Sequence, residues 1–337
     1  MSKIILQKKP FVDFDRVLNS DWYKIISILL SEIQQTTNEF YRENYEGFVN
    51  IPVPITCSSI SSPFGLGSDS EPVQIKLFNK KVFLSDSMQF HLEYLIRQGF
   101  NGVYYIMPTF RGEDPDCRHL NQFFHSEVEL KGDLIKILEV AELYVRKLAS
   151  NIFNKYAQQI LTLTGKIDHI KNFIAVDYKI PRITFEESIN ILGNQKHLFK
   201  FFNTKAVNFS SEGEQLLMEK FNGPVWVTHY PIEGVPFYQA WTENEKYAKC
   251  ADLLLGIGET IGCGERHESY SDTIKALTHH KVDPKRYSWY LNLKQEYPLQ
   301  TSGFGMGIER LICWILNHKD IRDIPLFNRL KGYESSP

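Results

Sequence analysis

A charged segment at residues 108–123 carries more groups able to bind a nucleotide than any other part of the chain. Arg111, Glu113, Arg118 and His119 lie there on a loop that glycine and proline keep out of regular structure. A guanidinium matches phosphate oxygens bidentately, and a neighbouring carboxylate can accept from an exocyclic amine. The residues alone leave open whether this loop clamps a nucleotide or is a solvated hairpin.

A second cluster lies at residues 250–266. Gly256 and Gly258 suit a tight turn between two strand-like flanks, so Asp252 and Glu259 are expected to face one site across it. Two carboxylates beside phosphate oxygens suit Mg²⁺, which keeps several waters and does not need a full protein cage. A hairpin with solvated acids is the alternative.

The third cluster, residues 303–316, begins with alternating glycines and continues into an apolar run containing Arg310. Only about thirty residues follow, too few for the strand–helix–strand unit of a dinucleotide-binding fold. The pattern instead predicts a glycine-lined strand entering a helix. Missing side chains would let a planar ring approach, and Arg310 would reach a phosphate or stack on that ring.

Strands and amphipathic helices are predicted around these clusters. Strands at 103–107 and 126–130 flank the charged loop, and a helix capped by Ser20 shows apolar spacing of three and four. Further helices are predicted from Asp133 to about Lys155, from Thr184, and over 210–221, with strands at 81–84 and 225–228.

The junction after the strand at 81–84 turns into a helix, where side chains often point into a pocket. Ser87, Gln89 and Glu93 are therefore ligand candidates, whereas Ser85 or Asp86 would cap the helix. The pair at 279–280, two histidines, has no nearby metal-binding partner in sequence and is interpreted as surface.

Composition limits the class of protein. With 337 residues, 43% of them hydrophobic, the chain can fill a large core. Its net charge of −2 gives no basic field for non-specific binding of nucleic acid. Five scattered cysteines without a C-x-x-C pair argue against a disulfide framework or a zinc site and predict reduced, mostly buried thiols. No window has the apolar length of a secretory signal or membrane span, so a cytoplasmic protein is expected.

Together the three clusters resemble the catalytic domain of class II aminoacyl-tRNA synthetases of the aspartyl/asparaginyl type, over roughly residues 20–333. Residues 110–113 with 118–120 and Phe123 resemble that family's second motif, although Gln122 stands where the family usually has an acid, and residues 303–310 resemble its third. Connecting signatures occur in the same order at 181–185, 230–231, 236–238, 289–291 and 321–323. The resemblance implies an α+β fold, an antiparallel sheet flanked by helices, with ATP bound on the sheet and a homodimer.

The resemblance also assigns roles to residues. Arg111 and Arg310 are the expected catalytic residues: Arg111 would hold the α-phosphate, and Arg310 with Phe123 would enclose the adenine. The other expected contacts are Glu113 with the adenine amine, Arg118 and His119 with the outer phosphates, Asp252 and Glu259 with Mg²⁺, and Ser87, Gln89, Glu93, Arg266 and Lys294 with the amino acid.

The amino-acid pocket resembles the asparaginyl version. Leu92 stands where aspartyl enzymes carry a lysine, and Glu93 matches an asparaginyl-type acid. Such an acid would repel a side-chain carboxylate and accept from an amide, so asparagine is expected to fit better than aspartate. Lys294 replaces the arginine that would hold the side-chain oxygen and loses its bidentate fork.

We expect one catalytic domain over residues 1–337 without an anticodon-binding domain, and hence a substrate other than tRNA. The leading hypothesis is ATP-dependent activation of asparagine, or a relative such as aspartate, through an adenylate, with transfer to a non-tRNA acceptor. The alternatives are amidation of aspartate with ammonia, as in archaeal asparagine synthetase-related proteins, dehydration of the asparagine amide to a nitrile, compact aminoacylation of tRNA or a carrier protein, and a non-catalytic sensor of amino acid or ATP.

Overall fold

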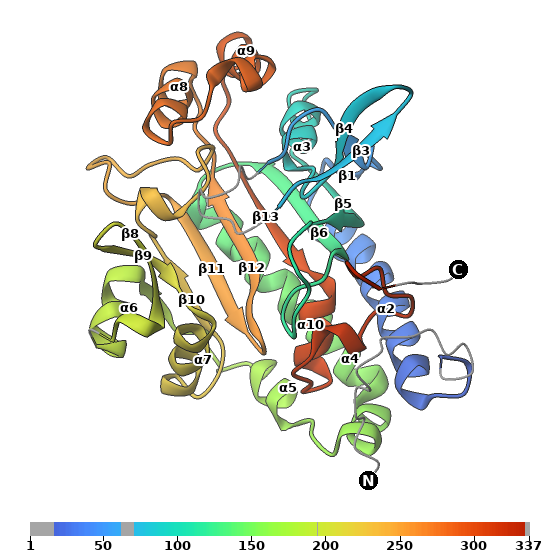
Figure 1. Ribbon diagram of the computed structural model, residues 1–337. Coiled ribbons are helices and arrows are strands. Elements are labelled where there is room, and N and C mark those ends of the chain that lie inside the picture. Colours follow the sequence, from blue (N-terminus) through green and yellow to red (C-terminus); the bar gives the residue numbers. More distant parts are fainter. Residues whose placement is uncertain (1–16, 62–70, 194, 334–337) are drawn as a thin grey trace.

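The computed structural model describes residues 17–61, 71–193 and 195–333, and an eight-stranded sheet forms its centre (Figure 1). In spatial order the strands are β1 (Phe48–Asn50), β5 (Gly102–Phe110), β6 (Gln122–Lys131), β13 (Thr301–Gly307), β12 (Gly258–Glu265), β11 (Cys250–Leu255), β10 (Val225–Thr228) and β7 (Arg182–Thr184). The six central strands pair antiparallel, and the edge strands β1 and β7 run parallel to their neighbours. The predicted α+β class with an antiparallel sheet is confirmed.

Helices α2 (Asp21–Asn44), α4 (Leu134–Thr164) and α10 (Ile308–Ile315) supply the largest core, which lies on one face of the sheet. The Asp133 side chain caps α4 by accepting from the Lys136 N–H, as expected. The helix runs past the predicted end at Lys155, because Ile160 keeps its apolar face buried for another turn and Gly165, at φ 71°, then stops it.

Of the remaining elements, α5 (Asp168–Phe173) and η4 (Ile321–Asp323) join the same core beside α4 and α10, and the others lie at the opposite face and the edges of the sheet (Figure 1). The other helices are α3 (Gln89–Ile96), α6 (Phe185–Leu192), α7 (Ser211–Lys220), α8 (Tyr270–His279) and α9 (Ser288–Glu296), with 3₁₀ turns η1 (Lys196–Leu198), η2 (Ile232–Gly234) and η3 (Pro284–Tyr287). Two small sheets are formed by β2 (Thr56–Cys57), β4 (Lys80–Leu84) and β3 (Val73–Leu77), and by β8 (Phe199–Phe202) with β9 (Lys205–Phe209).

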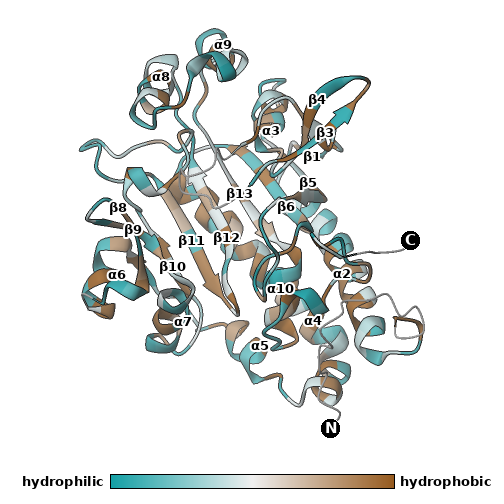
Figure 2. Ribbon diagram, viewed as in Figure 1, coloured by the Kyte–Doolittle hydropathy of each residue, from teal (hydrophilic) through white to brown (hydrophobic). Residues whose placement is uncertain are grey.

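Strand β11 is mostly hydrophobic (Figure 2), in keeping with the burial of five of its six residues. Leu253 and Leu255 face the core that contains α2, α4 and α10, whereas Leu254 faces a second core built from α6, α7 and β10. The alternation of strand side chains therefore separates two apolar layers at this strand.

Local predictions had mixed outcomes. Thr184 forms the predicted capping box with Glu187. Ser20 stands at the N-cap of α2, but its side chain makes no capping hydrogen bond. The predicted cap by Ser85 or Asp86 is wrong, because α3 begins later and has Met88 at its N-cap.

The two neighbouring histidines and the five cysteines differ in how deeply they are buried. His280 is buried while His279 is exposed, so the surface interpretation was wrong for His280, which turns inward at the end of α8. All five cysteines are free thiols, and Cys250, Cys263 and Cys313 are buried. Within the described ranges, no helix has the length and apolarity needed to cross a membrane.

Candidate active site

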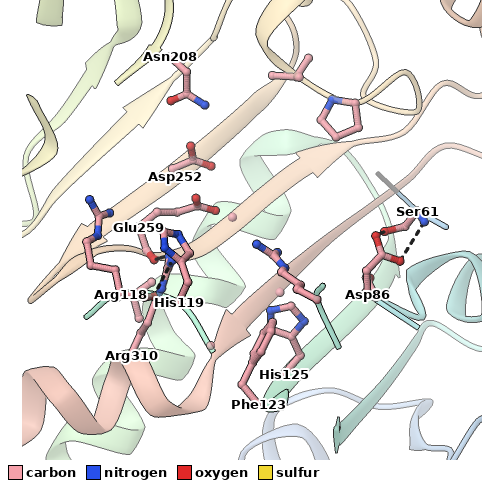
Figure 3. Close-up of a pocket in the computed structure, with 18 of the residues that line it drawn as sticks. Ser61, Asp86, Arg118, His119, Phe123, His125, Asn208, Asp252, Glu259 and Arg310 are labelled. Atoms are coloured by element: carbon pink, nitrogen blue, oxygen red, sulfur yellow. Dashed lines mark hydrogen bonds between the residues drawn. The ribbon is translucent and has the colours of Figure 1, made fainter. Parts of the chain in front are cut away.

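A cavity of about 500 Å³ opens on the sheet face opposite α2 and α4 (Figure 3). Eleven of the thirteen predicted site residues line it: Ser87, Gln89, Arg111, Glu113, Arg118, His119, Phe123, Asp252, Glu259, Arg266 and Arg310. The other two, Glu93 and Lys294, do not line it. Residues from the three sequence clusters and from the start of α3 therefore meet around one space.

The alternation of side chains along β6 and β13 creates the floor of this cavity. On β6, Phe123, His125 and Glu127 point to the cavity, whereas Ser126 and Val128 point to the helical core. On β13, glycines 303, 305 and 307 pair with Glu129, Glu127 and His125. A Cβ on Gly303 would collide with the Glu129 carboxylate, and one on Gly305 would lie 3.3 Å from Glu127 Oε1. The glycines thus make room for buried carboxylates and for a ligand.

Three arginines, Arg111, Arg118 and Arg310, line the cavity. The Cζ atom of Arg111 lies 5.5 Å from the centre of the Phe123 ring, and Arg111 Nε is buried without a hydrogen-bond partner among the described residues. Arg118 pairs with Glu214, and Arg310 donates to the Glu259 carbonyl. Burial lowers the pKa of Arg310. A buried N–H without an acceptor is costly, so an acceptor atom of a ligand, such as a phosphate oxygen, fits beside Arg111 Nε.

Asp116 organises the loop between β5 and β6. Its Oδ1 atom accepts from the backbone N–H of Arg118 at 2.7 Å and of His119 at 2.9 Å, and it lies 2.9 Å from His119 Nδ1. Burial, together with the charge of Arg310, lowers the pKa of His119, so this imidazole is neutral near pH 7. Glu113 lines the cavity and accepts from the Glu71 N–H at 3.1 Å.

Asp252 and Glu259 share one face of the hairpin β11–β12. An ideal Cβ on Gly262 would lie 2.7 Å from Glu259 Oε1 and 3.5 Å from Asp252 Oδ1, so both carboxylates approach the same point. Ile261 pairs with Leu253 and Glu259 with Leu254, leaving Thr260 as the extra residue of a bulge. The bulge turns Glu259 to the cavity while Ile261 stays in the core.

This acid pair fits a divalent cation. Burial and the charge of Glu259 raise the pKa of Asp252 well above its ordinary value, because no cationic side chain compensates the pair fully. Within the described residues, no group of three or more His, Cys, Asp or Glu side chains is arranged to hold a metal ion. Carboxylates from Asp252 and Glu259 would therefore hold Mg²⁺ together with phosphate oxygens and water.

Glu93 and Lys294 form a buried ion pair next to the cavity. Lys294 Nζ lies 2.6 Å from Glu93 Oε2, neither side chain is exposed, and the Tyr290 hydroxyl donates to Glu93 Oε1 at 2.8 Å. Although burial opposes ionisation, the charges of Lys294, Arg266 and Arg97 keep the pKa of Glu93 below its ordinary value. The positive charge of Lys294 balances the negative charge of Glu93. Glu93 therefore gives no electrostatic reason for the pocket to prefer the side-chain amide of asparagine over the carboxylate of aspartate.

The remaining substrate candidates surround the other end of the cavity floor. Ser87 donates to Glu127 Oε2 at 3.0 Å, and Gln89 Nε2 is buried without a partner among the described residues. Arg266 forms a buried ion pair with Glu129 at 3.0 Å. Leu92, in contrast, packs in a hydrophobic cluster with neighbours that include Met88 and Val103, so its side chain does not reach the cavity.

Several lining residues were not identified from the sequence: Asp116, His125, Glu127, Glu214 and Glu309. The period-two alternation from Phe123 onward was sufficient to place His125 and Glu127 on the same face as Phe123. Glu214 comes from the first turn of α7 and has no local sequence signal of its role. Glu309 accepts from the Phe124 N–H at 3.0 and 3.1 Å and joins α10 to β6.

Glu309 predicts a pH-dependent loss of stability. Burial raises its pKa from 4.5 to about 7, so its contribution is complete below pH 4.5 and is lost as the pH rises through 7. The variant Glu309→Gln keeps an acceptor for Phe124 but has no proton to lose. The difference in unfolding free energy between this variant and the wild type is expected to shift in favour of the variant by on the order of 3 kcal/mol as the pH rises from 4.5 to 8. Urea unfolding at each pH measures this difference. The same change at exposed Glu296 is the control, and a parallel pH dependence of both variants would contradict the assignment.

Known proteins resemble this chain in both sequence and fold. The sequence matches the family of class II tRNA synthetases (D, K and N) over residues 6–331. An asparagine–tRNA ligase of Thermococcus gammatolerans is 32% identical over 261 residues, which cover 76% of this chain and 59% of that protein. One from Koribacter versatilis is 28% identical, covering 88% and 66%. This chain therefore spans about three fifths to two thirds of the length of these curated relatives.

Solved structures extend the similarity. Asparaginyl-tRNA synthetase from Pyrococcus horikoshii, crystallised with asparaginyl-adenylate, superposes with a TM-score of 0.85 at 27% identity, covering 96% of this chain and 72% of that one. The Entamoeba histolytica asparaginyl-tRNA synthetase has a TM-score of 0.83 at 22% identity, covering 99% and 76%. The second similarity concerns the fold alone.

Proposed function

The chain belongs to the class II tRNA synthetase family of the D, K and N type, and on this premise we propose that it activates asparagine or aspartate with ATP as an aminoacyl adenylate. The observation that carries the proposal is the convergence of Arg111, Arg310 and the pair Asp252–Glu259 on one cavity. Cationic donors and paired carboxylates with these surroundings suit a nucleotide–magnesium complex.

The proposed reaction joins the substrate carboxylate to the α-phosphorus of ATP, with pyrophosphate as the leaving group. Negative charge accumulates on the phosphate oxygens during the attack, and Arg111, which lines the cavity, would stabilise it without moving. Arg310 would reach the nucleotide from the opposite side. Mg²⁺ held by Asp252 and Glu259 would supply positive charge to the phosphates.

Asparagine remains the preferred substrate of the proposal, supported by the relatives named as asparagine–tRNA ligases. We propose an acceptor other than tRNA, supported by the net charge of −2, which gives no basic field for a polyanion. A homodimer, implied by the family resemblance, stays part of the proposal, and light scattering of the purified protein tests it.

An amino-acid panel tests the activation step. The protein with ATP, Mg²⁺ and one amino acid at a time is expected to exchange labelled pyrophosphate into ATP with asparagine or aspartate at least about tenfold faster than with unrelated amino acids, since a hydrogen-bonding pocket discriminates strongly. Removing divalent cations with EDTA should abolish exchange. Exchange that is absent or independent of the amino acid contradicts the proposal. Mass spectrometry of products formed with ammonia distinguishes an amide, a nitrile and a free adenylate.

A further inference from the structure

We propose that His125 and Glu127 form a proton relay that deprotonates an amine acceptor as it attacks the activated carboxyl group. The inference rests on the proposed adenylate-forming function and names the chemical class of the second substrate. His125 would be the catalytic residue that contacts the amine, and Glu127 the final proton acceptor.

The place of His125 on β6 supports this role. Phe123, His125 and Glu127 occupy successive positions on the cavity face, about 7 Å apart along the strand. Phe123 lies beside Arg111 at the nucleotide end, and Glu127 lies beside Ser87 at the other end. Figure 3 shows His125 next to Phe123 at the cavity floor. His125 is thus positioned where a bond between the nucleotide phosphate and the substrate carboxyl group would form.

Contacts of the two side chains define the direction of the relay. His125 Nδ1 lies 3.2 Å from Glu127 Oε1 and 3.3 Å from Thr109 Oγ1. Glu127 Oε2 already accepts from the Ser87 hydroxyl, the Met88 N–H and the Tyr105 hydroxyl, so Oε1 is the oxygen available to the imidazole. With Nδ1 engaged, Nε2 is the ring nitrogen left to contact a ligand in the cavity.

Electrostatics favour transfer from the imidazole to the carboxylate. Burial, with Arg111 and Arg310, lowers the pKa of His125 to about 3, whereas burial raises the pKa of Glu127 to about 8. Asp86 adds to the rise at Glu127, and Arg266 opposes it. When His125 Nε2 accepts a proton, His125 Nδ1 therefore gives its proton to Glu127. The direction follows because the Glu127 carboxylate is a stronger base than the imidazole.

The charges near the relay favour an amine as the second substrate. Asp86 and Glu127 both line this part of the cavity, and Asp86 is held by Ser61 through two hydrogen bonds of 2.9 and 3.0 Å. The Asp86 carboxylate attracts a cationic amine and repels an anionic acceptor, and Glu127 adds its negative charge above its pKa of about 8, whereas Arg111, Arg310 and Arg266 oppose this attraction. In the step, an ammonium acceptor first loses one proton to solvent. The nitrogen of the resulting neutral amine then forms a bond to the carbonyl carbon, and the bond from that carbon to the phosphate oxygen breaks. AMP leaves with the electron pair, and the amine proton passes through His125 to Glu127.

The test separates the two half-reactions in His125→Gln, which retains a polar side chain but cannot relay a proton. With methylamine as the acceptor, amide formation is expected to fall about 100-fold or more, while pyrophosphate exchange falls less than about tenfold. Hydroxylamine, already unprotonated at neutral pH, should be captured at a rate that rises between pH 7 and 9 in the wild type and is flat in the variant. His125→Asn repeats the test if the first variant is unstable.

His119→Gln is the matched control, because the same substitution at the phosphate end should reduce exchange more than amine capture. Equal losses of exchange and capture in His125→Gln would overturn the relay, and so would unchanged capture of methylamine. A wild-type protein that exchanges pyrophosphate but forms no amide with either amine would overturn the amine class. Absence of exchange in the wild type would instead refute the activation step itself.

Discussion

Replacing Arg111 with alanine is expected to lower amino-acid-dependent pyrophosphate exchange by roughly 100-fold to 1,000-fold, the effect typical of losing one pre-positioned charge-stabilising group. The guanidinium lies against Phe123, and its Nε atom has no partner among the described residues, so its main interaction is expected with ligand phosphate. The backbone of Arg111 pairs with Asn121, and these contacts do not need the side chain.

The fold of Arg111→Ala should therefore survive, which circular dichroism and the melting temperature check. Arg182→Ala is a matched control: this arginine lies on edge strand β7, is exposed, and its guanidinium lies 3.9 Å from Glu142. Such a surface change is expected to leave exchange unaltered and stability nearly so. Undiminished exchange in a folded Arg111→Ala protein would contradict the assignment of the active site.

The largest expected loss of stability follows from Lys294→Met. This change leaves the Glu93 carboxylate buried without its cation, and breaking such a pair typically costs about 3–5 kcal/mol. Tyr290 would still donate to Glu93, but a hydroxyl cannot replace a charge. The measurement is the free energy of unfolding in urea at pH 7.

Two further variants identify the cause of that loss. Glu93→Gln combined with Lys294→Met removes both charges and is expected to recover a large part of the stability, because the desolvation cost disappears with the carboxylate. Lys275→Met breaks an ion pair of 2.5 Å with Glu245, but both side chains are about half exposed, so a loss below about 1 kcal/mol is expected. Equal losses in the two lysine variants would show that burial of the Glu93–Lys294 pair has no special role.

Local sequence patterns were sufficient for most elements. Apolar spacing and capping residues predicted α6 and α7, and the start of α4 at Asp133, because these signals depend on neighbours within a few residues. The hairpin β5–β6 and the strand β13 leading into α10 were also predicted. Predictions were wrong where distant packing decides: α3 begins after its expected cap, and His280 is buried.

Residue types alone identified the three clusters that line the cavity. Arginines, paired acids and alternating glycines are typical of sites that bind phosphates and metal ions. The sequence did not reveal that Asp116 holds the charged loop or that Glu214 pairs with Arg118, because these contacts join side chains that no periodic pattern relates. It also treated Glu93 as an isolated acid, whereas the fold brings Lys294 from 201 positions away to within 2.6 Å.

The sequence by itself determined the family resemblance and which residues carry the chemistry, because both depend on side-chain type and order along the chain. The tertiary structure decided which of these residues line the same cavity and which of them are ionised there. The bulge at Thr260 turns Glu259 toward Asp252, and the pairing of β6 with β13 sets His125 and Glu127 opposite glycines. Pairing, bulges and burial arise only when distant strands meet, and they set the charges that the cavity presents to a ligand.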